Sequence, residues 1–289
     1  MKKNLSIGVV VPTYQGAHHI QRCLVPLLQS PLQPRILVVD SGSSDNTVDI
    51  AKTLGVEIIT IKQEAFNHGA TREMARQYLN CDIIVMMSQD AYPKTSKMLE
   101  LLVEPIKNGA AAIAYARQLP HKEANFFAAF LRHFNYPTQS HLRSIKDIAK
   151  YESYTFFCSN SCAAYLNSAL NDIDGFSRVS FGEDTLAVAR LLLHGYSIAY
   201  VAEAQVYHSH NSNLRDEFNR YYQIGRLHRQ YADLFTLAGK ANKQGKLYLQ
   251  QLSRELWRKY PHLLPYGCMQ IFAKWAGYYL GRAAVSGKN

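Results

Sequence analysis

Short apolar runs alternate with amphipathic stretches through the first 120 residues of the chain. Runs such as Ile7–Val11, Ile36–Val39 and Ile83–Met87 are continuous, which is typical of strands buried on both faces of a parallel sheet. Between them, apolar residues recur at helical spacing, as from Ala17 to Gln29. The predicted strands are residues 7–11, 36–39, 56–61, 83–87 and 110–116, and the predicted helices are residues 17–29, 47–54, 70–79 and 96–107. This order predicts an α/β fold with a right-handed, mostly parallel, Rossmann-like sheet covered on both faces.

The pattern changes after residue 118, where the alternation of strands and helices is lost. Residues 118–152 contain Pro120, Pro137 and several aromatic residues without strand or helix periodicity. Long irregular segments in compact domains are usually functional or mobile, so we expect a lid over a binding site. Further on, we predict strands at residues 154–157, 198–201 and 205–208, helices at residues 162–170 and 183–194, and helical structure from Arg215 onward.

Charge divides the chain into two parts of different character. The 289 residues carry a formal net charge of +10, and residues 215–289 contribute +9 of it through 13 Lys/Arg and 4 Asp/Glu. We therefore predict two domains, residues 1–214 and a basic, aromatic-rich helical extension of residues 215–289. The charge favours an anionic partner such as an acidic membrane surface, although a solvated helical face would have the same composition. Trp257 and Trp275 suit a membrane surface, or equally the core of a helical appendage.

Composition narrows the class of protein further. Apolar residues make up 47% of the chain and charged residues 19%, which excludes a disordered protein. No run reaches the roughly 18 apolar residues of a membrane-spanning helix, and no nucleic-acid recognition motif accompanies the basic segment. Five scattered cysteines without zinc-ligand spacing indicate reduced thiols. No signal peptide is visible, so we expect a cytoplasmic protein, peripheral at the inner face of the cell membrane.

Polar turns follow several predicted strands, at the edge of the sheet where open α/β folds bind ligands. Asp40 is placed to accept a hydrogen bond from a nucleobase, and Asp45 to hold ribose or phosphate, but ordinary turn chemistry explains both carboxylates equally well. Asp90 follows the strand at residues 83–87 and precedes Pro93, which we expect to open a helix. A carboxylate at this place suits a hard divalent cation bound to a diphosphate, or a helix cap.

Taken together, these turns and further motifs resemble glycosyltransferase family 2, whose members have the GT-A fold. The resemblance covers roughly residues 5–214, and several motifs in the right order are far more specific than any one of them. Within the family, the chain resembles the rhamnosyltransferase-like members that build bacterial surface polysaccharides such as O-antigen. The motifs that carry the resemblance are Pro12-Thr13-Tyr14, Val39-Asp40-Ser41-Gly42-Ser43-Ser44-Asp45, Phe66-Asn67-His68-Gly69-Ala70-Thr71-Arg72, Ser88-Gln89-Asp90-Ala91, Phe181-Gly182-Glu183-Asp184 and Val206-Tyr207-His208-Ser209-His210.

The resemblance implies how a nucleotide-sugar donor and a metal ion would bind. Arg72 would approach the diphosphate or the donor sugar, unless it is only a cation on a helix surface. Asp90 matches the last Asp of an Asp-x-Asp metal motif, and Ser88 stands where the first Asp would be. We expect His208 to complete a Mg²⁺ or Mn²⁺ site, whereas His210, which alternates with it, would face away. The implied donor-binding residues are Pro12, Thr13, Tyr14, Asp40, Asp45, Arg72 and Gln89.

The resemblance also implies the catalytic base and the reaction. Inverting transfer needs a carboxylate that faces the acceptor hydroxyl, opposite the leaving diphosphate. We expect this base to be Asp184, with Glu183 as the second choice and helix capping as the alternative role for both. The expected reaction is metal-dependent transfer of L-rhamnose from dTDP-rhamnose to a lipid-linked glycan, with residues 118–152 on the acceptor side. A catalytically silent nucleotide-sugar-binding regulatory or scaffold protein is the alternative, which the missing first Asp permits.

Overall fold

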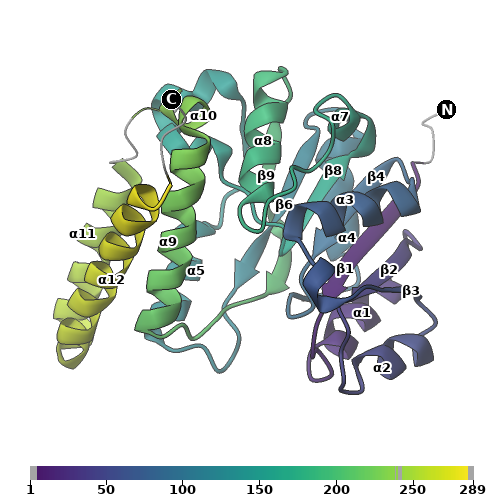
Figure 1. The fold of residues 1–289 in the computed structure, drawn as a ribbon, viewed down its shortest axis with the longest axis horizontal. Coiled ribbons are helices and arrows are strands. Elements are labelled where there is room, and N and C mark those ends of the chain that lie inside the picture. The colour runs from purple at the N-terminus through teal and green to yellow at the C-terminus, as the bar shows by residue number, and fades with distance from the viewer. Residues whose placement is uncertain (1–4, 238, 240–242, 286–289) are drawn as a thin grey trace.

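The computed structural model describes residues 5–237, 239 and 243–285, so the outermost residues of both predicted domains lie outside it. Its centre is one nine-stranded sheet in the order β3-β2-β1-β4-β8-β6-β9-β5, with β7 paired to β9 (Figure 1). The N-terminal half of the sheet is parallel, as predicted: β1 pairs with β2 and β4, and β2 pairs with β3. Its elements are β1 (Ile7–Thr13), α1 (Ile20–Leu28), β2 (Arg35–Asp40), α2 (Thr47–Thr53), β3 (Glu57–Thr60), the 3₁₀ turn η1 (Gln63–Ala65), α3 (His68–Leu79) and β4 (Ile83–Met87).

Helices cover both faces of this sheet, as the continuous apolar strands predicted. Val9 and Val11 of β1 pack in one core cluster with Leu24 of α1. Val10 points to the opposite face and packs in a second cluster with Leu79 of α3. Because successive strand residues face opposite sides, a strand buried on both faces has no polar position to alternate with.

The second half of the sheet is mixed, because an antiparallel strand enters it. β8 runs antiparallel to both β4 and β6, and β9 then pairs in parallel with β6. Two expected strands, 198–201 and 205–208, are one strand, β9, whose register against β6 shifts between Val201 and Gln205. The elements are β5 (Tyr92–Pro93), α4 (Met98–Lys107), β6 (Ile113–Leu119), β7 (His141–Arg143), the 3₁₀ turns η2 (Ile145–Asp147) and η3 (Glu152–Phe156), β8 (Cys162–Leu166), α7 (Asn167–Asn171), α8 (Glu183–Leu193) and β9 (Ile198–Tyr207).

Four expectations for this region are wrong. Pro93 does not open a helix but lies in β5, which pairs with β9. The expected helix at residues 162–170 is mainly the strand β8, and the expected strand at residues 154–157 lies largely in the 3₁₀ turn η3. Residues 118–152 are not irregular throughout, because they contain β7, α5 (Phe126–Asn135) and α6 (Ile148–Tyr151). Asn125 begins α5 by accepting a hydrogen bond from the backbone N–H of Ala128 at 2.9 Å.

The C-terminal helices lie at the end of the molecule opposite to β3 (Figure 1). They are α9 (Leu214–Gln230), α10 (Ala232–Thr236), α11 (Lys243–Lys259), the 3₁₀ turn η4 (Pro261–Leu263) and α12 (Leu264–Ala283). Leu227 of α9 packs in the same core cluster as Leu186 of α8, so these helices share a core with the sheet domain. A separate domain of residues 215–289 stays a prediction. None of the helices in the described part of the chain combines the length and apolar character that crossing a bilayer requires.

Candidate active site

The turns after β1 and β2 are joined by hydrogen bonds around Asp40. One oxygen of the buried Asp40 carboxylate accepts from the hydroxyls of Thr13 and Ser43, at 3.3 and 2.6 Å. The other accepts from the backbone N–H groups of Gly42 and Ser43, at 3.0 and 2.9 Å. These contacts are the turn role that the sequence allowed for Asp40. Direct contact between Asp40 and a nucleobase stays a prediction.

Asp45 and Gln89 tie the same turns to their neighbours. Asp45 accepts hydrogen bonds from the backbone N–H groups of Ala17 and Thr47, which fixes the turn after β1 against the start of α2. The amide of Gln89 accepts from the backbone N–H of Tyr14 at 3.0 Å and donates to its carbonyl at 3.1 Å. Hydrogen bonds thus join the turns that carry the predicted donor-binding residues from Pro12 to Asp45, and Gln89 connects them to the turn after β4.

Three side chains that suit a cation meet beyond the ends of β4 and β9. His208 Nε2 lies 3.5 Å from Asp90 Oδ1, and His210 Nε2 lies 3.6 Å from Asp90 Oδ2. The ligand atoms of the three residues all lie within 4.8 Å of one another. The expectation that His210 faces away is wrong, because residues two apart in an extended chain point to the same side and not to opposite sides. His208 and His210 follow the end of β9 at Tyr207, and both face Asp90.

The protonation states of this trio fit a metal site. Burial lowers the pKa of both His208 and His210, so the imidazoles are neutral at neutral pH. Burial alone would raise the pKa of Asp90, but at acidic pH both histidines are protonated, and a hydrogen bond donated by His208 together with their two charges holds that pKa well below the usual range. One carboxylate anion and two neutral imidazoles are the forms that coordinate a divalent ion. Because two of the ligands are nitrogens, the set suits Mn²⁺ better than Mg²⁺, which prefers oxygen.

A buried relay sets the tautomer of His208. Arg132 Nη1 donates to Gln118 Oε1 at 2.8 Å, and His208 Nδ1 lies 2.9 Å from the same oxygen. A guanidinium only donates, so the amide of Gln118 must present its oxygen, and Nδ1 of His208 must carry the proton. The lone pair of Nε2 is then directed at Asp90. Metal-binding histidines are typically held in this way by a partner on the other ring nitrogen.

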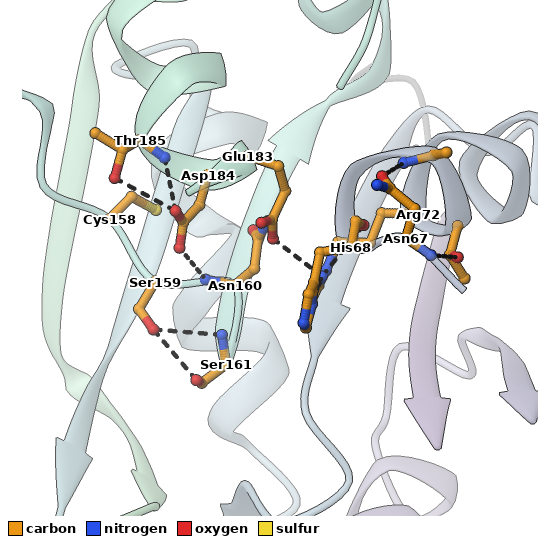
Figure 2. Close-up of polar contacts among 12 residues, drawn as sticks. Asn67, His68, Arg72, Cys158, Ser159, Asn160, Ser161, Glu183, Asp184 and Thr185 are labelled. Atoms are coloured by element: carbon orange, nitrogen blue, oxygen red, sulfur yellow. Dashed lines mark hydrogen bonds and ion pairs between the residues drawn. The ribbon is translucent and has the colours of Figure 1, made fainter. Parts of the chain in front are cut away.

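Glu183 and Asp184 stand at the first turn of α8 and have different partners (Figure 2). Glu183 Oε1 lies 3.0 Å from Arg72 Nη1 and accepts from Asn160 Nδ2 at 3.0 Å. Arg72 also lies 3.0 Å from His68 Nδ1. In this structure Arg72 therefore neutralises Glu183 and is not a surface cation. Its approach to a diphosphate stays a prediction.

Asp184 has no cationic partner at hydrogen-bond distance among the described residues. Its carboxylate accepts only from the backbone N–H groups of Asn160 and Thr185, at 3.2 and 2.7 Å, and from the Thr185 hydroxyl. Burial and the neighbouring charge of Glu183 raise the pKa of Asp184 to about 6. The pKa of Glu183 is lowered: burial acts against this, but the charge of Arg72 and the hydrogen bond from Asn160, with smaller contributions, together outweigh it. A carboxylate with a pKa near the working pH is suited to general base catalysis, which favours Asp184 over Glu183.

A cavity of about 1290 Å³ brings these groups together. Arg72, Glu183, Asp184, His208 and His210 all line it. The strand-end residues from Pro12 to Asp45 do not belong to this lining, so the structure places the predicted site residues in two groups. Further walls come from α5, α9 and α12, with Asn125, Arg132, Glu217, Arg220, Gln270 and Lys274 among the lining residues.

Three residues of the site escaped the sequence analysis, Gln118, Arg132 and Asn160, and a fourth, His210, was considered there but expected to face away. Arg132 is the only Lys, Arg, Asp or Glu between Phe126 and Pro137, a segment that is otherwise largely apolar. A lone charge on an apolar helix indicates a buried partner. Asn160 lies in the polar segment Ser159–Ser161 between two apolar runs. The backbone N–H of Asn160 donates to Asp184, and its side-chain amide donates to Glu183. Only folding brings Asn160 beside these two carboxylates of α8.

Fold and site define a class of protein. A sheet that carries polar turns at its strand ends, with a potential cation trio beyond those ends and a carboxylate at a helix start that shares a cavity with the two histidines of the trio, is typical of the GT-A arrangement of nucleotide-sugar glycosyltransferases. The sequence profile described as Glycosyl transferase family 2 matches residues 8–174. The chain belongs to this family.

Two curated relatives extend over nearly the whole chain. The O-antigen chain rhamnosyltransferase RfbN of Salmonella typhimurium is 36% identical over 282 residues, which is 96% of this chain and 90% of that protein. The O-antigen chain rhamnosyltransferase WbaN of Salmonella anatum is 35% identical over 281 residues, covering 96% and 89%. The similarity thus continues past residue 174 into the C-terminal helices.

Solved structures support the fold. The mannosyltransferase PcManGT from Pyrobaculum calidifontis, in complex with GDP-Man and Mn²⁺, matches with a TM-score of 0.60 at 13% identity, over 97% of this chain and 87% of that one. S. aureus TarS 1-349 in complex with UDP-GlcNAc also has a TM-score of 0.60, at 14% identity, over 93% and 79%. At such identities the likeness shows a common GT-A fold, which confirms the predicted fold class.

Proposed function

We propose that this chain is an inverting, Mn²⁺-dependent rhamnosyltransferase of O-antigen synthesis, which transfers L-rhamnose from dTDP-rhamnose to a lipid-linked glycan. The observation that carries the proposal is the single cavity shared by Asp184 and the two imidazoles beside Asp90. The names of the two relatives support rhamnose as the sugar. An acceptor that is anchored to lipid supports a peripheral position at the inner face of the cell membrane.

Asp184 would act as the general base. The acceptor hydroxyl gives its proton to the Asp184 carboxylate as its oxygen attacks the anomeric carbon and the bond to the nucleoside diphosphate breaks. Glu183 cannot compete for this proton, because Arg72 and Asn160 hold it in the ionised form. The backbone N–H groups of Asn160 and Thr185 keep the Asp184 carboxylate oriented. General base catalysis of this kind contributes about 10²- to 10⁴-fold in rate.

Asp90, His208 and His210 would hold the divalent ion. When bound, the ion neutralises charge on the diphosphate and so makes it a better leaving group. The chain's own contribution is to keep Nε2 of His208 unprotonated through Gln118, and to offer only one anionic ligand. Ser88, in the place of a second carboxylate, lines the cavity and leaves room there for donor or water.

The proposal is tested by following radiolabelled rhamnose from dTDP-rhamnose into a lipid-linked O-antigen acceptor. Transfer should stop in EDTA and return with Mn²⁺, and Mg²⁺ should restore it less well. Asp90→Ala removes the anionic member of the trio and should abolish transfer with Mn²⁺ present. Lys94→Gln is its matched control, because Lys94 is an exposed residue near the same turn that does not belong to the trio. Transfer that continues undiminished in chelator would remove the ion from the mechanism. Donor binding without transfer or hydrolysis would favour the silent binding protein.

A further inference from the structure

α12 has the reverse of the usual amphipathic arrangement. The face that it buries carries Gly267, Gln270, Lys274, Gly277 and Gly281. The face that it exposes is apolar, with exposed fractions of 48–66% for its large side chains. The exposed members of this face, which we call the aromatic row, are Met269, Phe272, Trp275, Tyr279 and Leu280. Helices of globular proteins normally turn such a stripe toward the core.

The aromatic row cannot turn inward. α9 lies against the glycine face so closely that a Cβ atom at Gly281 would come within 2.0 Å of the Tyr222 carbonyl oxygen, and one at Gly277 within 2.4 Å of the Phe218 carbonyl oxygen. Lys274 Nζ lies 3.7 Å from Glu217 Oε2 on the same side. Rotation of α12 would break this buried ion pair and force side chains between two backbones. The row therefore stays exposed unless another surface covers it.

The row is continuous and carries no charge. The rings of Phe272 and Trp275 lie 6.2 Å apart, and those of Trp275 and Tyr279 lie 5.0 Å apart. From Leu264 to Gly281 the sole charged residue is the buried Lys274. Exposed apolar patches of this kind mark interaction sites. Rings of Trp and Tyr are favoured at the boundary between lipid and water.

We propose that the aromatic row inserts into the headgroup region of an anionic membrane. Charge supports this occupant, because exposed basic residues stand at the ends of the C-terminal helices: Arg258 and Lys259 in the last turn of α11, which leads into α12, and Arg282 in the last turn of α12 itself. Basic residues bring a helix to an anionic surface, and its apolar side chains then insert. Attraction by charge alone would not require an aromatic face.

The same helix faces the active-site cavity on its other side. Gln270, Lys274 and Arg282 line that cavity, and Tyr279 belongs both to the lining and to the aromatic row. This part of the inference rests on the proposed function: an acceptor sugar held by a lipid would enter where α12 meets the membrane. The row would place the cavity at the depth of the lipid headgroups.

The experiment compares binding of the full chain to sedimented vesicles of neutral lipid and of neutral lipid with anionic phosphatidylglycerol. The Met269→Ser, Phe272→Ser, Trp275→Ser triple variant should bind anionic vesicles at least about tenfold more weakly than the unchanged chain. The matched control replaces Tyr78, Leu101 and Leu193 by Ser, since these apolar residues are also exposed on helices and lie outside the cavity. The control should bind as the unchanged chain does. Undiminished binding by the triple variant would overturn the proposal.

Tryptophan emission gives a second measurement that needs no polar variant. Trp257 and Trp275 are the two tryptophans of the chain. In Trp257→Phe, the emission of Trp275 should shift to shorter wavelength on anionic vesicles and be quenched by brominated lipid. An unshifted, unquenched emission would overturn insertion. If the chain is a dimer without lipid and the triple variant is a monomer, the row is instead an interface between copies.

Failure of this inference can be told apart from failure of the proposed function. Hydrolysis of dTDP-rhamnose with Mn²⁺, in the absence of any acceptor, should be the same in the triple variant and in the unchanged chain. Asp184→Asn, in turn, should bind vesicles as the unchanged chain does. Loss of hydrolysis in the triple variant would contradict a surface role for the row.

Discussion

Two neighbouring carboxylates on α8 differ in pKa because only one of them has a cationic partner. Glu183 lies 3.0 Å from Arg72 and keeps its charge. Asp184 accepts only from neutral donors, and the charge of Glu183 opposes its ionisation. Under the proposed function, these adjacent residues of one helix turn have separate tasks: Glu183 positions and Asp184 is catalytic.

This arrangement predicts a pH dependence of transfer. Asp184 must be deprotonated to accept a proton, so the rate should fall as the pH drops below about 6. Glu183→Gln removes the negative charge that raises the pKa of Asp184, so the acidic limb of the pH–rate profile should move to lower pH. Donor affinity, measured over the same pH range, separates this effect from protonation of the metal-binding histidines. If the acidic limb of Glu183→Gln stays at the same pH or moves to higher pH, the assignment of Asp184 as the base is contradicted.

The relay through Gln118 predicts an effect on metal affinity. Gln118→Leu removes the acceptor that holds the proton on Nδ1 of His208, so Mn²⁺ should bind about 10- to 100-fold more weakly. Titration calorimetry or the electron paramagnetic resonance of free Mn²⁺ measures this without any turnover. Gln250→Leu, at an exposed position of α11, is the control and should bind Mn²⁺ normally. Equal affinity in both variants would mean that the relay is structural.

Among single residues, the sequence analysis singled out those within motifs and overlooked those whose contacts are with distant segments of the chain. Asp90, His208 and the Glu183–Asp184 pair at the start of α8 lie within recognisable sequence motifs. Asn160 and Gln118 do not, and each functions by joining segments far apart in sequence, such as residues 118 and 208. Their geometry depends on the antiparallel β8 and on α5, which the sequence analysis did not predict.

At the scale of elements, prediction succeeded where strands and helices alternate and failed where they do not. The run at β4 is rich in Ile and Val, which favours a strand. The run at β8 is Cys-Ala-Ala-Tyr-Leu, and short Ala-containing runs fit a buried helix equally well. β8 is a strand because it lies between β4 and β6, where both neighbours supply hydrogen bonds. That long-range pairing cannot be read from local sequence.

The contact between α9 and α12 predicts a large cost for a small change. In Gly281→Ala the new methyl group would meet a backbone oxygen at 2.0 Å, so the helices must separate. The free energy of unfolding should fall by about 1–3 kcal/mol, as for overpacked cores. Gly245→Ala in α11 is the matched control, since no described residue outside its own helix turn lies within 4 Å of the added Cβ, and it should leave stability unchanged or slightly raised. Denaturant titration measures both, and equal stability would contradict the close packing.

At the scale of the whole molecule, the C-terminal helices complete the site. The family profile ends at residue 174, whereas RfbN and WbaN match over 96% of the chain. α9 and α12 line the cavity that holds Asp184. The sequence predicted the basic charge of this part but not its place beside the active site. That place depends on packing between α8 and α9, where Leu227 enters the core.

The central claim is that the chain transfers rhamnose with inversion of its anomeric configuration, with Asp184 as the general base and the cation trio as the site of the divalent ion. The most direct test is the anomeric configuration of the product, read by NMR after transfer from dTDP-rhamnose with Mn²⁺, for the unchanged chain and for Asp184→Asn. We predict that the product has the configuration opposite to the donor. We also predict that Asp184→Asn lowers turnover by about 10²-fold or more while donor affinity is nearly unchanged. A product with the donor's configuration, or full turnover in Asp184→Asn, would contradict the account.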